Sequence, residues 1–197
     1  VHMARIAVVA VAGCPASGVT GIIDAMAVAD HWIRLSPLGD EFRITVDVLS
    51  EDGRPVIGFA GTAIAVDHAV TDAASYDVVI VPPVVLDPVG AFLQCEATLA
   101  WLRGLPRTTV VTSVGTGAVL LAESGVLDGE TATTNPALES VFAQRYPNVR
   151  LDLSSVLVDN GRVVTAGVMA AFIDLALHLV HRLAGHVIAV STAKALG

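Results

Sequence analysis

The stretch TVVTSVGTGAVLLAESGVLDG, from Thr109 to Gly129, decides the fold of this chain. Its first five residues, Thr109–Ser113, are rich in β-branched side chains and predict a buried strand. The chain then turns at Gly115-Thr116-Gly117 and continues as an apolar helix over Ala118–Glu123. A strand, a sharp turn and a helix N-terminus form the nucleophile elbow with which α/β enzymes hold a reactive Ser or Cys above a sheet. Here the apex of the turn is Gly115, so the elbow is present without a nucleophile.

Strands and helices are expected to alternate along the chain on both sides of the elbow. Apolar residues at helical spacing mark the helices, and short β-branched runs mark the strands. This alternation predicts an α/β fold in which a mostly parallel sheet is covered by helices on both faces. Strands buried on both faces also explain a hydrophobic content of 54% with only 15% charged residues. The expected strands are Ile6–Ala12, Phe42–Leu49, the short pair Pro55–Phe59 and Ala63–Val66, Val78–Val81, and the hairpin Val156–Asp159 with Arg162–Thr165; the other expected helices are Thr20–Leu35, Phe92–Leu102, Asn135–Tyr146, Met169–Leu183 and His186–Leu196.

Length and composition limit the class of protein. A chain of 197 residues fits one domain, which we take as 1–197, and it contains no repeats or obvious linkers. The longest apolar run, Val163–Val180, is interrupted by Thr165, Asp174 and His178, so the sequence predicts no membrane-spanning segment. The two cysteines lie far apart and no secretory signal precedes the first strand, which favours a reducing cytoplasm.

The ends and the charge of the chain suggest part of a larger protein. Val1-His2, ahead of Met3, resembles a vector remnant, so the native sequence is expected to begin at Met3. The chain stops at Ala195-Leu196-Gly197 directly after a predicted helix, as an excised domain would. With 19 acidic residues against 11 Lys and Arg, the net charge of −8 argues against direct binding to a phosphate backbone.

Four segments together suggest a family. They are IAVVAVAGCPASGVTGIIDAMAVAD at Ile6–Asp30, VVTSVGTGAVLLAESGVLDGETATT at Val110–Thr134, FAQRYPNVRLD at Phe142–Asp152, and VLVDNGRVVTAGVMAAFIDLALHLVHRLAG at Val156–Gly185. The chain resembles the ThiJ/PfpI branch of the class I glutamine amidotransferase-like superfamily. More narrowly, it is similar to the amidase-like N-terminal domain of AraC-type transcription regulators. The resemblance implies a flavodoxin-like three-layer α/β sandwich, usually dimeric.

Four parts of that family's catalytic device differ in this chain. Enzymatic members carry a Cys at the elbow apex, where this chain has Gly115, and many carry a His at the position of Asn135. A carboxylate from the loop before the first helix aligns with Gly18. A glycine whose N–H helps to bind an oxyanion is replaced by Pro83, which has no N–H to donate. The resemblance therefore implies a pocket without catalytic residues.

A free cysteine and a polar helix face could also support chemistry, and each has a simpler structural interpretation. Cys14 follows the first strand near the edge where ligands bind, but a small buried structural thiol is the more common outcome. Asp174, His178 and His181 share one helix face, but a metal ion would need further ligands from elsewhere. The favoured interpretation is a helix that packs on the sheet and carries these polar side chains at the rim. No metal or cofactor is predicted.

The pocket itself is expected to remain and to bind a small-molecule effector. A helix that begins at Thr116-Gly117 presents free N–H groups and the positive end of its dipole, which suit a carboxylate or another polar group. Asn135 can both donate and accept a hydrogen bond. Asp24, in the first predicted helix, is either a cap or rim residue or a ligand contact. The expected ligand-binding residues are Gly18, Asp24, Pro83, Gly115, Thr116 and Asn135.

Three functions are compatible with these features. The favoured one is a catalytically inactive, ligand-sensing and dimerising domain of a cytoplasmic AraC-family transcription regulator, which reaches DNA only through a separate helix-turn-helix domain. The second is a stand-alone hydrolase, hydratase or glyoxalase-like enzyme of the same superfamily. The third is a non-catalytic interaction scaffold. The parent reading frame distinguishes them, because the first function requires a basic helix-turn-helix region beyond Gly197.

Overall fold

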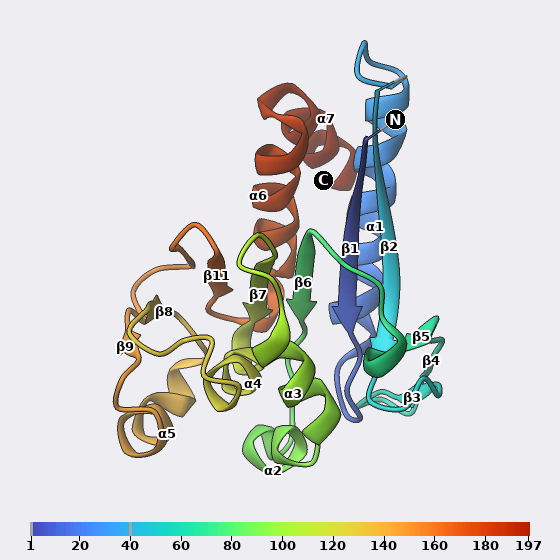
Figure 1. Ribbon diagram of the computed structural model, residues 1–197. Coiled ribbons are helices and arrows are strands. Elements are labelled where there is room, and N and C mark those ends of the chain that lie inside the picture. The colour runs from blue at the N-terminus through green and yellow to red at the C-terminus, as the bar shows by residue number, and fades with distance from the viewer. Residues whose placement is uncertain (1, 40) are drawn as a thin grey trace.

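A seven-stranded sheet runs through the centre of the molecule (Figure 1). The computed structural model describes residues 2–39 and 41–197, and in this sheet only β10 runs antiparallel to its neighbour. The parallel strands therefore end at one common edge, where binding sites of open α/β sheets lie. The strands are, in order across the sheet, β10 (Leu157–Asp159), β11 (Val163–Ala166), β7 (Val110–Val114), β6 (Val78–Val81), β1 (His2–Val9), β2 (Phe42–Ser50) and β5 (His68–Ala69).

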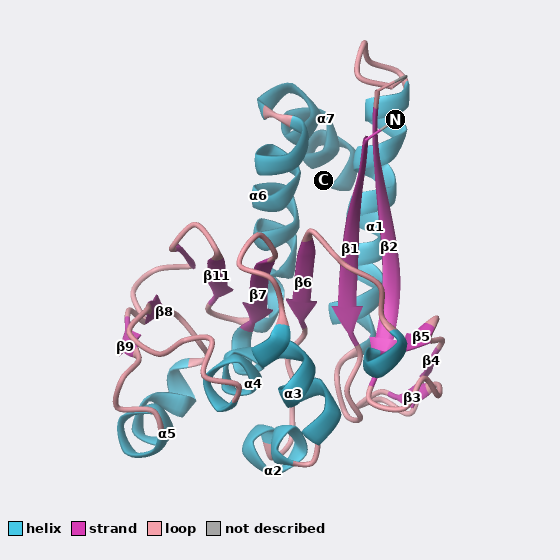
Figure 2. Ribbon diagram, in the orientation of Figure 1, coloured by secondary structure: helices cyan, strands magenta, loops and turns pink. Residues whose placement is uncertain are grey.

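Helices cover both faces of the sheet (Figure 2). On one face α1, α6 and α7 pack against one another, and on the other α4 packs against α2 and α3. This arrangement confirms the predicted three-layer α/β sandwich with a mostly parallel sheet. The helices are α1 (Ala16–Arg34), α2 (Pro88–Leu93), α3 (Glu96–Gly104), α4 (Ala118–Glu123), α5 (Glu139–Arg145), α6 (Phe172–Ala184) and α7 (His186–Leu196), with 3-10 turns η1 (Val70–Asp72), η2 (Gly115–Gly117), η3 (Pro136–Leu138) and η4 (Met169–Ala171). Two small sheets lie outside the centre: the antiparallel pair β3 (Val56–Ile57) and β4 (Ala63–Ile64), and the parallel pair β8 (Thr131–Ala132) and β9 (Arg150–Leu151).

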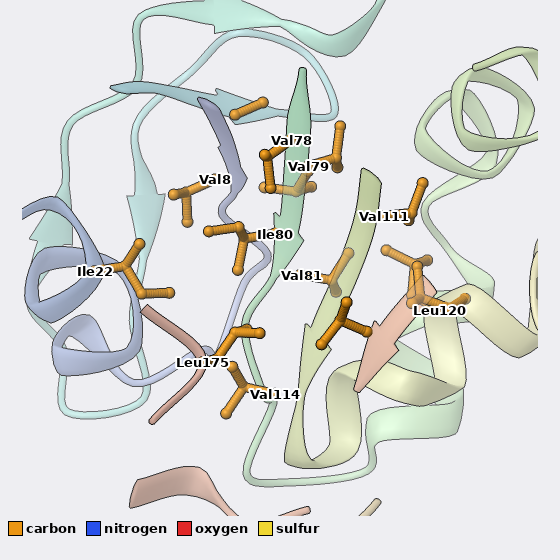
Figure 3. Close-up of a cluster of buried hydrophobic side chains, with 14 of the residues drawn as sticks. Val8, Ile22, Val78, Val79, Ile80, Val81, Val111, Val114, Leu120 and Leu175 are labelled. Carbon is orange, nitrogen blue, oxygen red and sulfur yellow. The ribbon is translucent and has the colours of Figure 1, made fainter. Parts of the chain in front are cut away.

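The core is formed by strands that are buried on both faces. All four residues of β6, Val78–Val81, are buried, so successive side chains pack alternately against the two helical layers. Figure 3 shows Ile22 of α1 and Leu175 of α6 on one side of these strands and Leu120 of α4 on the other. A Cβ added to Gly21 would overlap the Phe172 ring, so glycine is required where α1 meets α6.

One buried carboxylate ties α1 to β2. Asp30 accepts hydrogen bonds from Arg43 Nε (2.8 Å), from Arg34 Nε (3.0 Å) and from the backbone N–H of Ile44 (3.0 Å). Burial raises the pKa of Asp30, but the hydrogen bonds from Arg43, Ile44 and Arg34 outweigh it and lower the pKa to about 2. The carboxylate therefore stays ionised and holds the helix on the strand.

The predicted helix Phe92–Leu102 is wrong, because this segment contains the end of α2 and most of α3, with a break at Cys95. Glu51, at the end of β2, accepts hydrogen bonds from the N–H groups of Ala97 (2.6 Å) and Thr98 (3.0 Å) in the first turn of α3. A carboxylate at that position satisfies two N–H groups that have no partner within the helix. The N-terminus of α3 is therefore stabilised by Glu51, a residue far away in the sequence.

The first strand and the first helix both begin earlier than predicted. The strand is His2–Val9 in place of Ile6–Ala12, and α1 begins at Ala16 in place of Thr20. The loop after β1 stays buried at Ala10 and Val11, so apolar composition alone did not mark the end of the strand. Of the two residues expected to be a vector remnant, Val1 lies outside the described residues, and His2 is the first residue of β1. No helix in the described part of the chain is long and apolar enough to cross a membrane.

Candidate functional site

The elbow forms as the sequence predicts. The strand β7 ends at Val114, η2 makes the turn, and α4 follows from Ala118. Gly115 has a φ of +52°, in the left-handed region where only glycine is free of strain. Its carbonyl oxygen accepts a hydrogen bond from Thr134 Oγ1 (2.9 Å), which fixes the turn against the segment before η3. The backbone of a nucleophile elbow is therefore kept, with no side chain at its apex.

A pocket of about 240 Å³ opens at this elbow. It contains four of the six residues predicted to bind ligand, although these come from three separate parts of the chain. None of the residues that the structure places in the pocket wall is a Cys, His, Lys, Asp or Glu. The wall therefore carries no group that titrates near neutral pH. The lining residues are Pro83, Val84, Val85, Gly115, Thr116, Asn135 and Met169.

The Thr116 side chain is used by the protein itself. Its Oγ1 donates a hydrogen bond to the carbonyl oxygen of Val84 (2.8 Å) and accepts one from the Val84 N–H (2.8 Å). This pair of bonds fastens the loop after β6 to the elbow. With both interactions made inside the protein, the hydroxyl shapes the pocket wall and is a poor candidate for a nucleophile.

Asn135 acts as the N-cap of η3. Its Oδ1 accepts a hydrogen bond from the N–H of Ala137 (3.0 Å), and Pro136 occupies the first position of the turn. The Nδ2 group remains available as a donor, and the side chain is half-buried. A side-chain amide is not basic enough to take up a proton near neutral pH, so Asn135 can hold a polar ligand but cannot act as a general base.

The other two predicted residues do not line the pocket. Gly18 is buried in the first turn of α1, and a Cβ added there would lie 3.4 Å from Pro83 Cδ and 3.6 Å from Pro82 Cβ. Gly18 therefore supports the pocket wall from behind. Asp24 is exposed on α1 and is not among the lining residues. In the other direction, the sequence prediction missed Met169, which follows β11 and could have been found from its place after a parallel strand.

The remaining nucleophile candidates are buried. Cys14 has no exposed surface, as expected for a structural thiol, and burial raises its pKa. Ser113 lies two residues before the apex Gly115, and its Oγ is buried without a hydrogen-bond partner in the described structure. Cys95 is buried as well, and burial, with a smaller contribution from the nearby Glu51, raises its pKa to about 11. None of these groups is poised for attack at neutral pH.

The polar face of α6 is used for packing. His178 Nε2 lies 2.6 Å from Asp159 Oδ2, and Arg182 NH1 lies 3.2 Å from the same oxygen. These contacts attach the β10–β11 hairpin to the helix, while Asp174 and His181 are exposed. Within residues 2–39 and 41–197, no group of three or more His, Cys, Asp or Glu side chains is placed to hold a metal ion. We therefore propose no metal site.

Comparison with known proteins identifies the family. The model of the DJ-1/PfpI family matches residues 5–182. The chain belongs to the DJ-1/PfpI family. It is 33% identical over 148 residues to the HTH-type transcriptional regulator CdhR of Pseudomonas aeruginosa, which covers 75% of this chain and 43% of that protein. It is 30% identical over 144 residues to isonitrile hydratase of Pseudomonas putida, which covers 72% of this chain and 60% of that protein. The chain thus spans less than two thirds of either relative's length.

Solved structures show the same fold. A putative transcriptional regulator of Vibrio parahaemolyticus superimposes with a TM-score of 0.86 at 16% identity, over 100% of both chains. An AraC family transcriptional regulator of Pseudomonas putida gives a TM-score of 0.75 at 19% identity, over 98% of this chain and 100% of the other. The predicted flavodoxin-like fold of the DJ-1/PfpI family is confirmed. The relatives that match most of the chain in sequence include a transcription regulator and an enzyme.

Proposed function

We propose that this chain is a catalytically inactive, ligand-sensing and dimerising domain of an AraC-family transcription regulator. The observation that carries the proposal is an elbow pocket with Gly115 at its apex and no titratable side chain in its wall. A thiolate nucleophile needs a Cys whose pKa is lowered and a neighbouring base, and this pocket offers neither. The 33% identity to CdhR supports the regulatory role.

The effector is proposed to bind in the elbow pocket, against Gly115, Thr116 and Asn135, with Pro83 in the pocket wall and Gly18 packed behind Pro83. Backbone N–H groups at the start of η2 and Nδ2 of Asn135 would donate hydrogen bonds to a polar group of the effector. The volume of about 240 Å³ is below the range of about 300–1,000 Å³ typical of ligand pockets, so a compact molecule is expected. Asp24 has no part in this proposal.

A homodimer would turn binding into a signal. Three exposed apolar side chains lie together in the sequence here, and we call them the η4 patch: Val168 just before η4, Met169 on η4 and Ile173 at the start of α6. Met169 also lines the elbow pocket, so a bound effector would contact a member of the patch. A two-fold contact through the η4 patch would therefore place the effector beside the dimer interface. An effector that prefers one dimer geometry by about 1–3 kcal/mol would change the spacing of attached DNA-binding domains.

The DNA would be read by another domain of the cytoplasmic protein. The charge of −8 repels a phosphate backbone, so this chain alone should bind duplex DNA weakly at any salt concentration. The product of the full reading frame should bind a palindromic or tandem site, and its affinity should fall as salt rises. Fluorescence anisotropy with both proteins tests this division of labour. Tight DNA binding by residues 1–197 alone, or a reading frame without a helix-turn-helix region, would disprove it.

The dimer has its own test. Ile173→Glu places a charge in the η4 patch without altering a residue of the elbow pocket. It should convert a dimer into a monomer at tens of micromolar in light scattering, whereas Asp24→Lys, an exposed change on α1, should not. A monomeric wild-type chain at that concentration would contradict the proposed dimer.

The alternative is a stand-alone enzyme, favoured by the 30% identity to isonitrile hydratase. It requires a nucleophile outside the elbow, and Cys14 is the one that the sequence suggested. Turnover of an isonitrile that is lost in Cys14→Ser would establish this alternative, and absence of turnover in the wild-type chain would favour the sensor.

A further inference from the structure

A larger cavity lies away from the elbow, at the carboxyl ends of β1 and β2. Its volume is about 650 Å³, within the range of small-molecule sites and well above that of the elbow pocket. It is lined by segments 10–12, 50–57 and 86–98, which follow β1, β2 and β6. Figure 2 shows the loop after β1, the β3–β4 hairpin and α2 together at the lower end of the sheet. We call it the switch-point cavity, because it lies where the chain changes from one face of the sheet to the other.

The chain reverses its direction of winding at this place. β1 lies between β2 and β6 in the sheet. From β1 the chain enters α1 on one face, and from β6 it enters α2 on the other face. Open α/β sheets bind ligands at such a point. Residues from both loops, Ala10–Ala12 and Leu86-Asp87, line the switch-point cavity, together with residues at the end of β2 and on α2 and α3.

The inner surface of the switch-point cavity is mainly apolar, and its two buried hydroxyls, of Ser50 and Thr98, are hydrogen-bonded within the protein. Ala10, Val11 and Cys95 form buried parts of its lining. Two large apolar side chains are left in solvent at its opening, Ile57 with 57% and Leu86 with 69% of their surface exposed. A molecule in the cavity would cover both, and the apolar area removed from water would contribute to its affinity.

Two charged groups of the lining, Glu51 and Asp87, accept hydrogen bonds within the protein, and the other two, Arg54 and Asp52, are exposed. Glu51 accepts the hydrogen bonds from the first turn of α3, and Asp87 Oδ1 accepts one from the N–H of Gly90 (3.1 Å). Arg54 Nε lies 3.7 Å from Asp52 Oδ2 in an exposed pair. A charged ligand on the inner surface would lose its hydration at a distance from the exposed Arg54–Asp52 pair, which is unfavourable.

The walls are cross-linked to one another. The Gly13 N–H donates a hydrogen bond to the Ile57 carbonyl oxygen (3.0 Å), and the Phe59 N–H donates one to the Cys14 carbonyl oxygen (2.9 Å), so the β3–β4 hairpin is fixed to the loop after β1. Glu51 fixes the end of β2 to α3 on the opposite side. The cavity is therefore formed before a ligand arrives, which lowers the entropy lost on binding.

We propose that the switch-point cavity is a second ligand site, separate from the elbow pocket, for an uncharged and mainly apolar small molecule. The proposal does not depend on the proposed regulatory function, since neither DNA nor the elbow enters it. It predicts that this chain binds such a molecule at one site, and that only changes in the lining of this cavity weaken the binding.

The experiment uses the neutral fluorescent dye N-phenyl-1-naphthylamine and the whole chain. Ala91→Leu fills the cavity from α2, and Val56→Trp fills it from β3. Each should weaken dye binding at least about tenfold, or about 1.4 kcal/mol. The matched control Ala100→Leu makes the same change on the exposed side of α3, and Asn135→Leu fills the elbow pocket. Both controls should bind the dye like the wild type.

Each outcome decides for or against the site. Loss of affinity in Ala91→Leu and Val56→Trp, with both controls unchanged, supports the proposal. Loss in Asn135→Leu with the cavity variants unchanged places the dye at the elbow and overturns it, as does absence of saturable binding to the wild type. Should the cavity variants fail to fold by circular dichroism, hydrogen exchange of the wild type decides. Protection of residues 50–57 by the dye then supports the site, and unchanged exchange there refutes it.

Discussion

Replacing Gly115 by Ala tests whether the backbone of the elbow requires glycine at its apex. With a φ of +52°, this residue lies in the left-handed region, where an L-residue loses about 1–2 kcal/mol. A Cβ added to Gly115 would lie 3.5 Å from Met169 N and 3.6 Å from Pro83 Cβ, which are ordinary contacts, so no clash adds to the loss. Gly115→Ala should therefore lower the free energy of unfolding by about 1–2 kcal/mol.

Urea denaturation followed by circular dichroism measures this difference. For a chain of this size the midpoint of thermal unfolding should fall by about 2–8 °C, at about 2–4 °C for each kcal/mol. The control is Gly161→Ala in the β10–β11 turn, where φ is +81° and no heavy atom lies within 4 Å of the added Cβ. The control should lose a similar amount. An unchanged Gly115→Ala beside a destabilised Gly161→Ala would refute the claim that the elbow requires glycine.

Gly115→Cys extends the test from stability to chemistry. It restores a thiol at the apex, but Asn135 cannot accept its proton and Pro83 cannot donate an N–H to an oxyanion. The variant should therefore hydrate isonitriles and hydrolyse esters no faster than Gly115→Ala. Turnover by the Cys variant that the Ala variant lacks would show that catalysis needs neither a base at position 135 nor an N–H donor at position 83. Gly115 alone would then account for the absence of activity in the wild-type chain.

Three further predictions concern single side chains. Asp30→Asn should lower the free energy of unfolding by about 2 kcal/mol at neutral pH, because the pKa of Asp30 is lowered from 3.8 to about 2. Since a lowered pKa stabilises the fold above the unfolded-state value, the difference from wild type should narrow from about pH 4 to about pH 2; a constant difference in urea titrations would contradict it. Thr116→Val should cost about 1–3 kcal/mol by leaving the N–H and carbonyl of Val84 without their partner, while Thr116→Ser should cost less; equal losses would mean that packing of the methyl group matters more. Cys14 and Cys95 should react with a thiol reagent only in denaturant, and fast labelling of the folded chain at Cys14 would restore it as a candidate nucleophile.

The sequence predicts best where local composition and burial agree. Val78–Val81 and Ala118–Glu123 have the same bounds in the prediction and in the structure, because a strand buried on both faces and an apolar helix after a glycine turn leave little choice locally. The elbow pocket could also be predicted in outline. Pro83, Gly115 and Thr116 meet because they follow the neighbouring strands β6 and β7 at the same edge of the sheet, whereas Asn135, after β8 of a separate small sheet, was expected there from the family resemblance.

The rest depends on interactions between distant residues. The break before α3 is stabilised by Glu51, which no window around Cys95 contains. In α1, Asp24 is exposed and the next residue, Ala25, is buried. The apolar spacing of the helix did not show which of these two neighbours faces the protein interior. The switch-point cavity was not predicted at all, because it is formed by loops after three strands whose mutual distances appear only in the folded chain.

The place of β7 in the sheet has a consequence for biosynthesis. This strand pairs with β6 on one side and β11 on the other, and 48 residues, 115–162, lie between its end at Val114 and the start of β11 at Val163. A ribosome that adds about 5–20 residues per second needs about 2–10 s to cross this interval. During that time the growing chain carries an apolar strand with one unpaired edge, which is a template for aggregation. The yield of this protein in a cell should therefore depend on elongation speed through codons 115–162 and on chaperones that cover the open edge.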